Sequence, residues 1–148
     1  MLGENHAHIF MNGVNYRQAV KEHEKGPEDS LIRSRLRAYQ EKGVSFVRDG
    51  GDYLHVSERA RELAQEYGID YRTPIFAIHK KGHYGGIVGR SFDTMKEYAV
   101  LVRKAADQGA DFIKIMTTGL MDFKHGGRVT GSALSLSEVK EMVHIAHE

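Results

Sequence analysis

Short apolar runs alternate along the chain with longer stretches in which apolar residues recur at helical spacing. The apolar runs cover residues 2–10, 44–47, 75–78 and 112–116, and their length and β-branched or aromatic content predict β-strands. The amphipathic stretches predict helices at about residues 15–24, 27–42, 57–67, 93–108 and from 135 onwards. In the last of these, Ser135 and Glu138 have the spacing of a capping box.

Four strands, each followed by helix, predict an α/β fold of right-handed βαβ units with a parallel sheet. Two architectures fit this order. One is an open doubly wound sheet of the flavodoxin type, in which the first strand lies centrally. The other is part of a (β/α)8 barrel, which usually needs about 250 residues, so that four βα units form half of a TIM barrel.

Composition narrows the class of protein. The 148 residues fit one domain, taken here as residues 1–148, with 21 basic and 20 acidic residues and no basic field that would favour nucleic acid. No apolar run approaches the roughly 20 residues of a membrane helix, and the first residues lack a signal-peptide pattern. The absence of cysteine excludes disulfides and thiolate metal sites. We therefore expect a cytoplasmic protein with neither nucleic acid nor membrane as a partner.

His6 and His8 are the first candidates for chemistry. They lie two apart on a predicted strand, so both side chains leave the same face, with their Cα atoms about 6.6 Å apart. Two imidazoles at this spacing can converge on one metal ion. The alternative is a pair of surface histidines without a ligand.

Lys114 is the second candidate, because it interrupts an apolar strand in which a buried ammonium would be costly. Burial favours the neutral amine, which can react with carbon dioxide to give a carbamate, an anion with two oxygens suited to bridging two cations. The alternatives are a lysine that reaches to the edge of the sheet, or a Schiff-base or general-base lysine.

Further polar residues follow the second and third strands, at the end where ligands gather in parallel α/β folds. Asp49 follows the second strand, and His79 and His83 follow the third. Asp49 is alternatively a turn-former before two glycines, and His83 a solvated loop residue. Four other histidines are interpreted as ordinary surface residues: His23, His55, His125 and His144.

Taken together, these segments resemble the amidohydrolase superfamily, in particular its imidazolonepropionase-like and Xaa-Pro or Xaa-Arg dipeptidase-like branch. The segments that carry the resemblance are residues 6–8, 43–51, 82–86, 109–119 and 137–148. They occur in the family's order and span nearly the whole chain.

The resemblance implies roles for particular residues. His6 and His8 would bind the more buried of two zinc ions, and carbamylated Lys114 would bridge the pair. His83 would lie at the substrate, a dipeptide-like or cyclic amide, and Asp49 would support the ligands from behind. Glu4 stands where the family usually has aspartate.

The resemblance covers the first strand to the fourth helix of the barrel. The family takes further metal histidines from the fifth and sixth strands, takes its catalytic aspartate from the eighth, and has a small β-sandwich before the barrel; none of these matches a segment of this sequence. We therefore assign no catalytic residue and expect a metal-dependent amidohydrolase fragment with negligible turnover alone, completed by another half-barrel. The alternative is a non-catalytic half-barrel that self-associates into a homo-oligomer and binds metal weakly.

Overall fold

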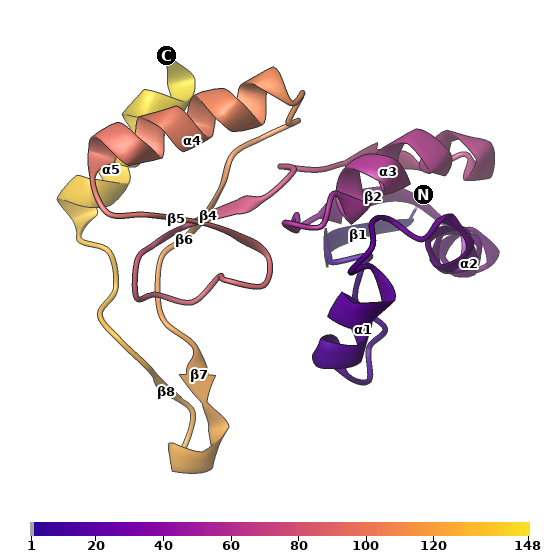
Figure 1. Ribbon diagram of the computed structural model, residues 1–148, viewed down its shortest axis with the longest axis horizontal. Helices are drawn as coiled ribbons and strands as arrows, with labels where there is room; N and C mark the ends of the chain where they lie inside the picture. Colours follow the sequence, from indigo (N-terminus) through magenta and orange to yellow (C-terminus); the bar gives the residue numbers. More distant parts are fainter. Residues whose placement is uncertain (1) are drawn as a thin grey trace.

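Two three-stranded parallel sheets, covered by helices, make up an α/β fold in the computed structural model, which describes residues 2–148 (Figure 1). Met1, the first residue of the expected domain, lies outside the described residues. The first sheet has the order β1–β2–β3, from β1 (Leu2–Ala7), β2 (Val44–Asp49) and β3 (Asp70–Arg72). Its helices are α1 (Tyr16–Glu22), α2 (Asp29–Glu41) and α3 (Val56–Ala64), the last extended by the 3-10 turn η1 (Gln65–Tyr67).

The second sheet has the order β5–β4–β6. Its strands are β4 (Ala77–Lys80), β5 (Gly89–Phe92) and β6 (Lys114–Met116), and its helices are α4 (Met95–Asp107) and α5 (Leu136–His147). A small antiparallel hairpin, β7 (Met121–Asp122) and β8 (Arg128–Val129), encloses the 3-10 turn η2 (Phe123–His125) and projects away from both sheets (Figure 1).

Strand order distinguishes the two architectures that the sequence allowed. β1 pairs in parallel with β2 and lies at the edge of its sheet, whereas an open flavodoxin-like sheet would place the first strand centrally. β2 pairs with β3 in the first sheet, and β4 pairs with β6 in the second. Apart from β5, the strands within each sheet are therefore neighbours in sequence order, as in a barrel. β5 is an addition on the other side of β4.

The third predicted strand differs from its prediction. Residues 75–78 were expected to be extended, but Ile75 has φ 67° and β4 begins only at Ala77. The backbone of Ile75 instead binds the segment around the start of α3. Its carbonyl accepts hydrogen bonds from Asp52 N at 3.0 Å and from Ser57 Oγ at 3.3 Å. The predicted third strand is therefore β4, shifted by two residues, and the short strand β3 that precedes it was not predicted.

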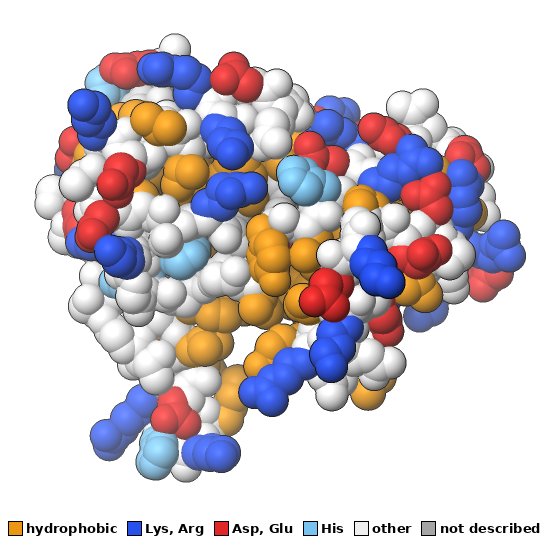
Figure 2. Space-filling model, viewed as in Figure 1, with side chains coloured by type: hydrophobic (Ala, Val, Ile, Leu, Met, Phe, Trp, Pro, Cys, Tyr) orange, Lys and Arg blue, Asp and Glu red, His pale blue; other side chains and the backbone are white. Residues whose placement is uncertain are grey.

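Each sheet has its own apolar core. Side chains of β1, β2, α2 and α3 pack together in the first, with Ile32, Leu36 and Val47 fully buried. The second joins β4, β5, α4 and α5 around Phe92, Tyr98 and Met142. Figure 2 shows apolar side chains in the middle of the viewed face, between the two groups of elements, with charged side chains over the flanking helices.

The predicted capping box of α5 is present, since Ser135 accepts from Glu138 N and the Glu138 side chain accepts from Ser135 N. α3 begins at Val56 rather than Ser57 and is capped from a distance, because the buried carboxylate of Asp52 accepts from the amides of both residues. No helix within residues 2–148 is both long and apolar enough to span a membrane.

The pairing of β4 with β5 depends on a glycine that has no space for a side chain. A Cβ at Gly89 would lie 2.0 Å from the carbonyl oxygen of Ala77, whereas one at Gly86 would meet nothing within 4 Å. We expect Gly89→Ala to lower the free energy of unfolding by at least about 2 kcal/mol, because backbone must move to relieve the overlap. Gly86→Ala should stay within about 0.5 kcal/mol of the wild type. Urea unfolding measures both, and equal midpoints for the two variants would contradict this account of β5.

Candidate metal centre

β1 and β6 bring His6 and Lys114 into contact, although 108 residues separate them in the sequence. The Nζ atom of Lys114 lies 2.8 Å from Nε2 of His6. β1 presents His6 and His8 on one face, while Ala7 between them is buried in the core on the other face. The alternation of the strand therefore separates the ligand candidates from the residues that anchor them.

His8 is oriented by the backbone of the loop after β2. Its Nδ1 lies 3.0 Å from the carbonyl oxygen of Gly51. Because a carbonyl only accepts, Nδ1 carries the proton and Nε2 presents a lone pair, which is the arrangement found in metal-binding histidines.

Gly50 forms the floor of a small space shared by His8 and Lys114. A Cβ at Gly50 would lie 2.5 Å from Nε2 of His8 and 2.6 Å from Nζ of Lys114. The rings of His6 and His8 have their centroids 5.4 Å apart. Three nitrogens, from His6, His8 and Lys114, therefore border one space.

The electrostatics of the site shift the pKa of each of these groups towards its neutral form. Burial lowers the pKa of His8 to about 4, so the ring is neutral at pH 7. The positive charge of Lys114, followed by partial burial, lowers the pKa of His6. Burial also lowers the pKa of Lys114, opposed by the charge of Asp49. Neutral imidazoles and an amine with a weakened hold on its proton are the forms that bind cations or carbon dioxide.

Asp49 fixes the strand ends that carry these groups. It is 1% exposed and accepts three hydrogen bonds: from Ile9 N at 2.9 Å, Gly51 N at 2.7 Å and Tyr71 Oη at 2.6 Å. Ile9 follows His8, and Gly51 carries the carbonyl that orients His8. Asp49 thus forms the turn that the sequence allowed and also supports His8 from behind.

Of the three nitrogen groups, the two imidazoles fit a zinc ion and the ammonium of Lys114 does not. Two neutral imidazoles are ordinary zinc ligands, but an ammonium has no lone pair and would have to lose its charge before it could contribute. Within residues 2–148 no three His, Cys, Asp or Glu side chains come together in a metal-binding arrangement. The third group here is a lysine.

His83 lies away from these nitrogens, in a pocket of about 600 Å³ built from the loops that follow β1, β4 and β6. Met11, Tyr16, Tyr84 and Leu120 provide most of its apolar lining. The Nδ1 atom of His83 is buried without a hydrogen-bond partner within residues 2–148.

His79 lies inside β4 rather than after it, with its ring against Gly85, and it does not join the metal candidates. The surface assignment of His23 is wrong, since this side chain is 1% exposed. Its Nδ1 accepts from Glu28 N, and its Nε2 lies 3.2 Å from the guanidinium of Arg35. The spacing of residues in α1 gave no sign of this burial, which depends on the approach of α2.

Arg35 was not predicted to have a role near the site. It donates to the carbonyls of Ile9 at 2.8 Å and Phe10 at 3.0 Å, and it pairs with Glu22 at 2.9 Å. It therefore fixes the chain just after His8. The sequence signal that could have identified Arg35 is its position next to the buried Leu36 of α2.

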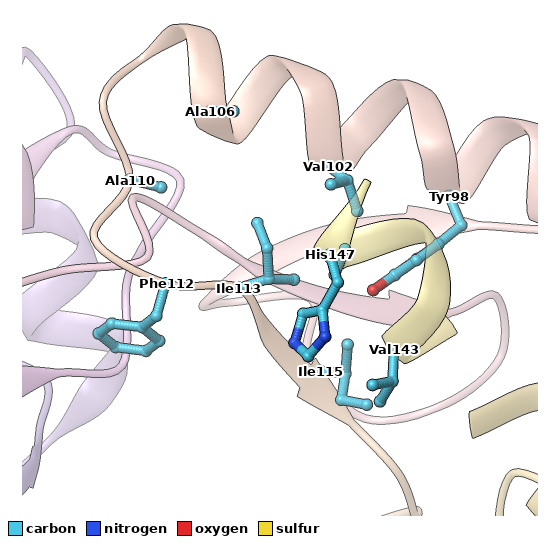
Figure 3. A pocket seen from close by; sticks show the side chains of 10 residues that line it. Tyr98, Val102, Ala106, Ala110, Phe112, Ile113, Ile115, Val143 and His147 are labelled. Carbon is cyan, nitrogen blue, oxygen red and sulfur yellow. The ribbon is translucent and has the colours of Figure 1, made fainter. Parts of the chain in front are cut away.

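A second hollow, of about 450 Å³, lies between α4, α5 and β6 (Figure 3). Ile113 and Ile115 line it from the strand, opposite Val102 and Val143 of the helices. His147 lies among these apolar side chains, which agrees with a packing role. This hollow is on the opposite face of β6 from Lys114.

Comparison with known proteins supports the architecture. No protein-family model matches the sequence, and no curated protein matches it. Three crystal structures match the fold: one of an uncharacterized protein (TM-score 0.69, 20% identity), one of an amidohydrolase (0.69, 21%) and one of a prolidase complexed with N-methylphosphonate-L-proline (0.65, 19%). They cover 98%, 99% and 98% of this chain, which spans only 39%, 40% and 40% of theirs. At this identity the likeness establishes the fold, which is confirmed as parallel α/β and corresponds to part of a larger barrel.

The space over Gly50 gives a direct test of the metal centre. We expect Gly50→Ala to lower zinc affinity at least tenfold, because the added methyl group would displace Nε2 of His8 or Nζ of Lys114. Gly3→Ala is the matched control on the paired strand, where a Cβ would meet no atom closer than 3.4 Å. Isothermal titration with zinc measures both. Equal affinities would show that the ion binds elsewhere.

Asp49 makes stability depend on pH in a particular window. Burial raises the pKa of Asp49 to about 6, above the ordinary value of 3.8, although the three hydrogen bonds oppose this rise. The folded protein therefore holds a proton that the unfolded chain releases between about pH 4 and 6, and stability falls as the pH rises through this range. We expect the free energy of unfolding of wild type relative to Asp49→Asn to fall by up to about 3 kcal/mol across it. Chemical denaturation at a series of pH values tests this, and a flat difference would contradict it.

Proposed function

We propose that this chain supplies the first half of a metal-dependent amidohydrolase centre, in which His6 and His8 bind zinc and Lys114 binds it as a carbamate. The observation that carries the proposal is the convergence of the three nitrogens over Gly50, with His8 held in the metal-binding tautomer by Gly51. The likeness in fold to structures described as an amidohydrolase and a prolidase supports it.

Lys114 contributes through a covalent step. Its neutral amine attacks the carbon of carbon dioxide, a nitrogen–carbon bond forms, and the proton lost from nitrogen passes to solvent. The product is an anionic carbamate with two oxygens. This exchange replaces a cation next to His6 by an anion, which removes the charge conflict at the site.

Zinc, when bound at such a site, supplies a Lewis acid that polarises a carbonyl and activates water. The residues of this chain orient the ligands and bind substrate. Asp49 and Arg35 fix the backbone on either side of His8. The pocket around His83 accepts an apolar portion of a dipeptide-like or cyclic amide, and the imidazole of His83 binds a polar group of the same molecule.

Hydrolysis also needs a base near the attacking water. Asp49, the buried carboxylate closest in sequence to the site, is committed to three donors. We propose that a further half-barrel supplies the base and the remaining metal ligands.

Metal binding tests this function without requiring turnover. We expect His6→Ala and His8→Ala each to lower zinc affinity by about 10- to 100-fold or more, because each removes one of two imidazole ligands. With bicarbonate present, the wild type should gain a second equivalent of zinc. Lys114→Arg should not, since a guanidinium does not form this carbamate. Competition with a chromophoric chelator measures affinity and stoichiometry.

His125→Ala is the matched control, because His125 lies exposed on the hairpin that projects away from both sheets (Figure 1). A ¹³C carbamate resonance that is present in the wild type and absent in Lys114→Arg would identify the modified residue. If His6→Ala and His8→Ala bound zinc as well as His125→Ala does, the proposed function would be wrong.

A further inference from the structure

Arg48 lies on the same face as the metal candidates and has no acidic partner there. It is exposed on β2, whereas its neighbours Val47 and Asp49 are buried on the opposite face. Its guanidinium carbon lies 4.1 Å from the centroid of the Phe112 ring. Both residues line a hollow of about 290 Å³ that also contacts His6 and Lys114.

The positive charge of Arg48 has no acidic partner on this face. Arg48 forms no hydrogen bond or salt bridge with a side chain within residues 2–148, whereas Arg33 and Arg59, on the outer helices, pair with carboxylates. Glu4 is the acidic residue of β1 on this face, and its Oε1 accepts from the backbone of His6. Asp49 also lines the hollow, but its carboxylate is occupied by three donors, so neither carboxylate pairs with Arg48.

The geometry of a (β/α)8 barrel indicates which part of the barrel would supply a counter-charge for Arg48. The interior of a (β/α)8 barrel is filled by layers of four side chains, contributed by alternate strands. Arg48 of β2 stacks on Phe112, which lies two residues before β6, so these two side chains would belong to one layer. The other two members come from whatever closes the barrel, and closure removes the guanidinium from water. A buried charge without a counter-charge costs several kcal/mol.

We propose that this face docks a second half-barrel of different sequence, which presents a carboxylate opposite Arg48. The proposal rests on the proposed function, since both require a closed barrel. The unpaired outer edges of β1 and β6 are where the partner's strands would add. A second copy of this chain fits this face poorly, because it would place two unpaired Arg48 guanidinium groups in one interior.

A charge-reversed copy of this chain is the probe. We expect a mixture of wild type and Arg48→Glu to associate at least about tenfold more tightly than wild type alone, because each mixed pair places a carboxylate opposite Arg48. Added salt should weaken this gain. Sedimentation velocity in EDTA measures association without metal, so the result is independent of whether His6 and His8 bind zinc.

Arg37→Glu is the matched control, because Arg37 is exposed on the outer helix α2. Circular dichroism first establishes that each variant folds. If Arg48→Glu does not fold, Arg48→Gln takes its place and should self-associate more tightly than wild type, since the repulsion is removed. The proposal is overturned if the Arg48 mixture is no tighter than the Arg37 mixture, if wild type alone associates as tightly, or if the substituted neutral variant associates no better than wild type.

Discussion

The buried carboxylate of Asp49 is the constraint on which the site depends. It binds donors from the end of β1, from the loop after β2 and from β3, and so ties three consecutive strands together at one point. A carboxylate with almost no exposure is costly unless it is satisfied, and three donors satisfy it. The positions of Gly50 and Gly51 follow from this contact, and the orientation of His8 follows from Gly51.

The alternation of the strands gives the molecule two unlike faces. On the helix-covered face, Ala7, Val47 and Ile115 join the apolar cores. On the other face, His6, Arg48 and Lys114 are left with charge and hydrogen-bonding capacity that the described part of the chain does not satisfy. The same alternation that builds the cores thus leaves a polar, charged surface. The proposed metal ion and the proposed partner carboxylate would bind there.

The sequence predicted the order of the main elements because each relies on local signals. The four predicted strands, the five helices and the capping box of α5 are present, apart from shifts at their ends. The meeting of His6 with Lys114 followed from placing both at strand positions of one parallel fold. What the sequence did not show depends on tertiary contacts. β5 was not predicted, and Gly89 permits its close approach to β4.

Two further features had no local signal. Ile75 leaves the extended conformation because its carbonyl is used by Asp52 and Ser57, which no strand pattern reveals. Arg48 had no predicted role, because its stacking on Phe112 depends on β2 and the segment before β6 facing one interior.

X-ray absorption at the zinc edge tests the central claim most directly. For the wild-type chain with one equivalent of zinc, the account predicts two imidazole nitrogens at about 2.0–2.1 Å, with oxygen ligands completing the coordination. The imidazole signal should fall to one in His8→Ala. A wild-type spectrum with no imidazole ligand, or one unchanged by His8→Ala, would contradict the account.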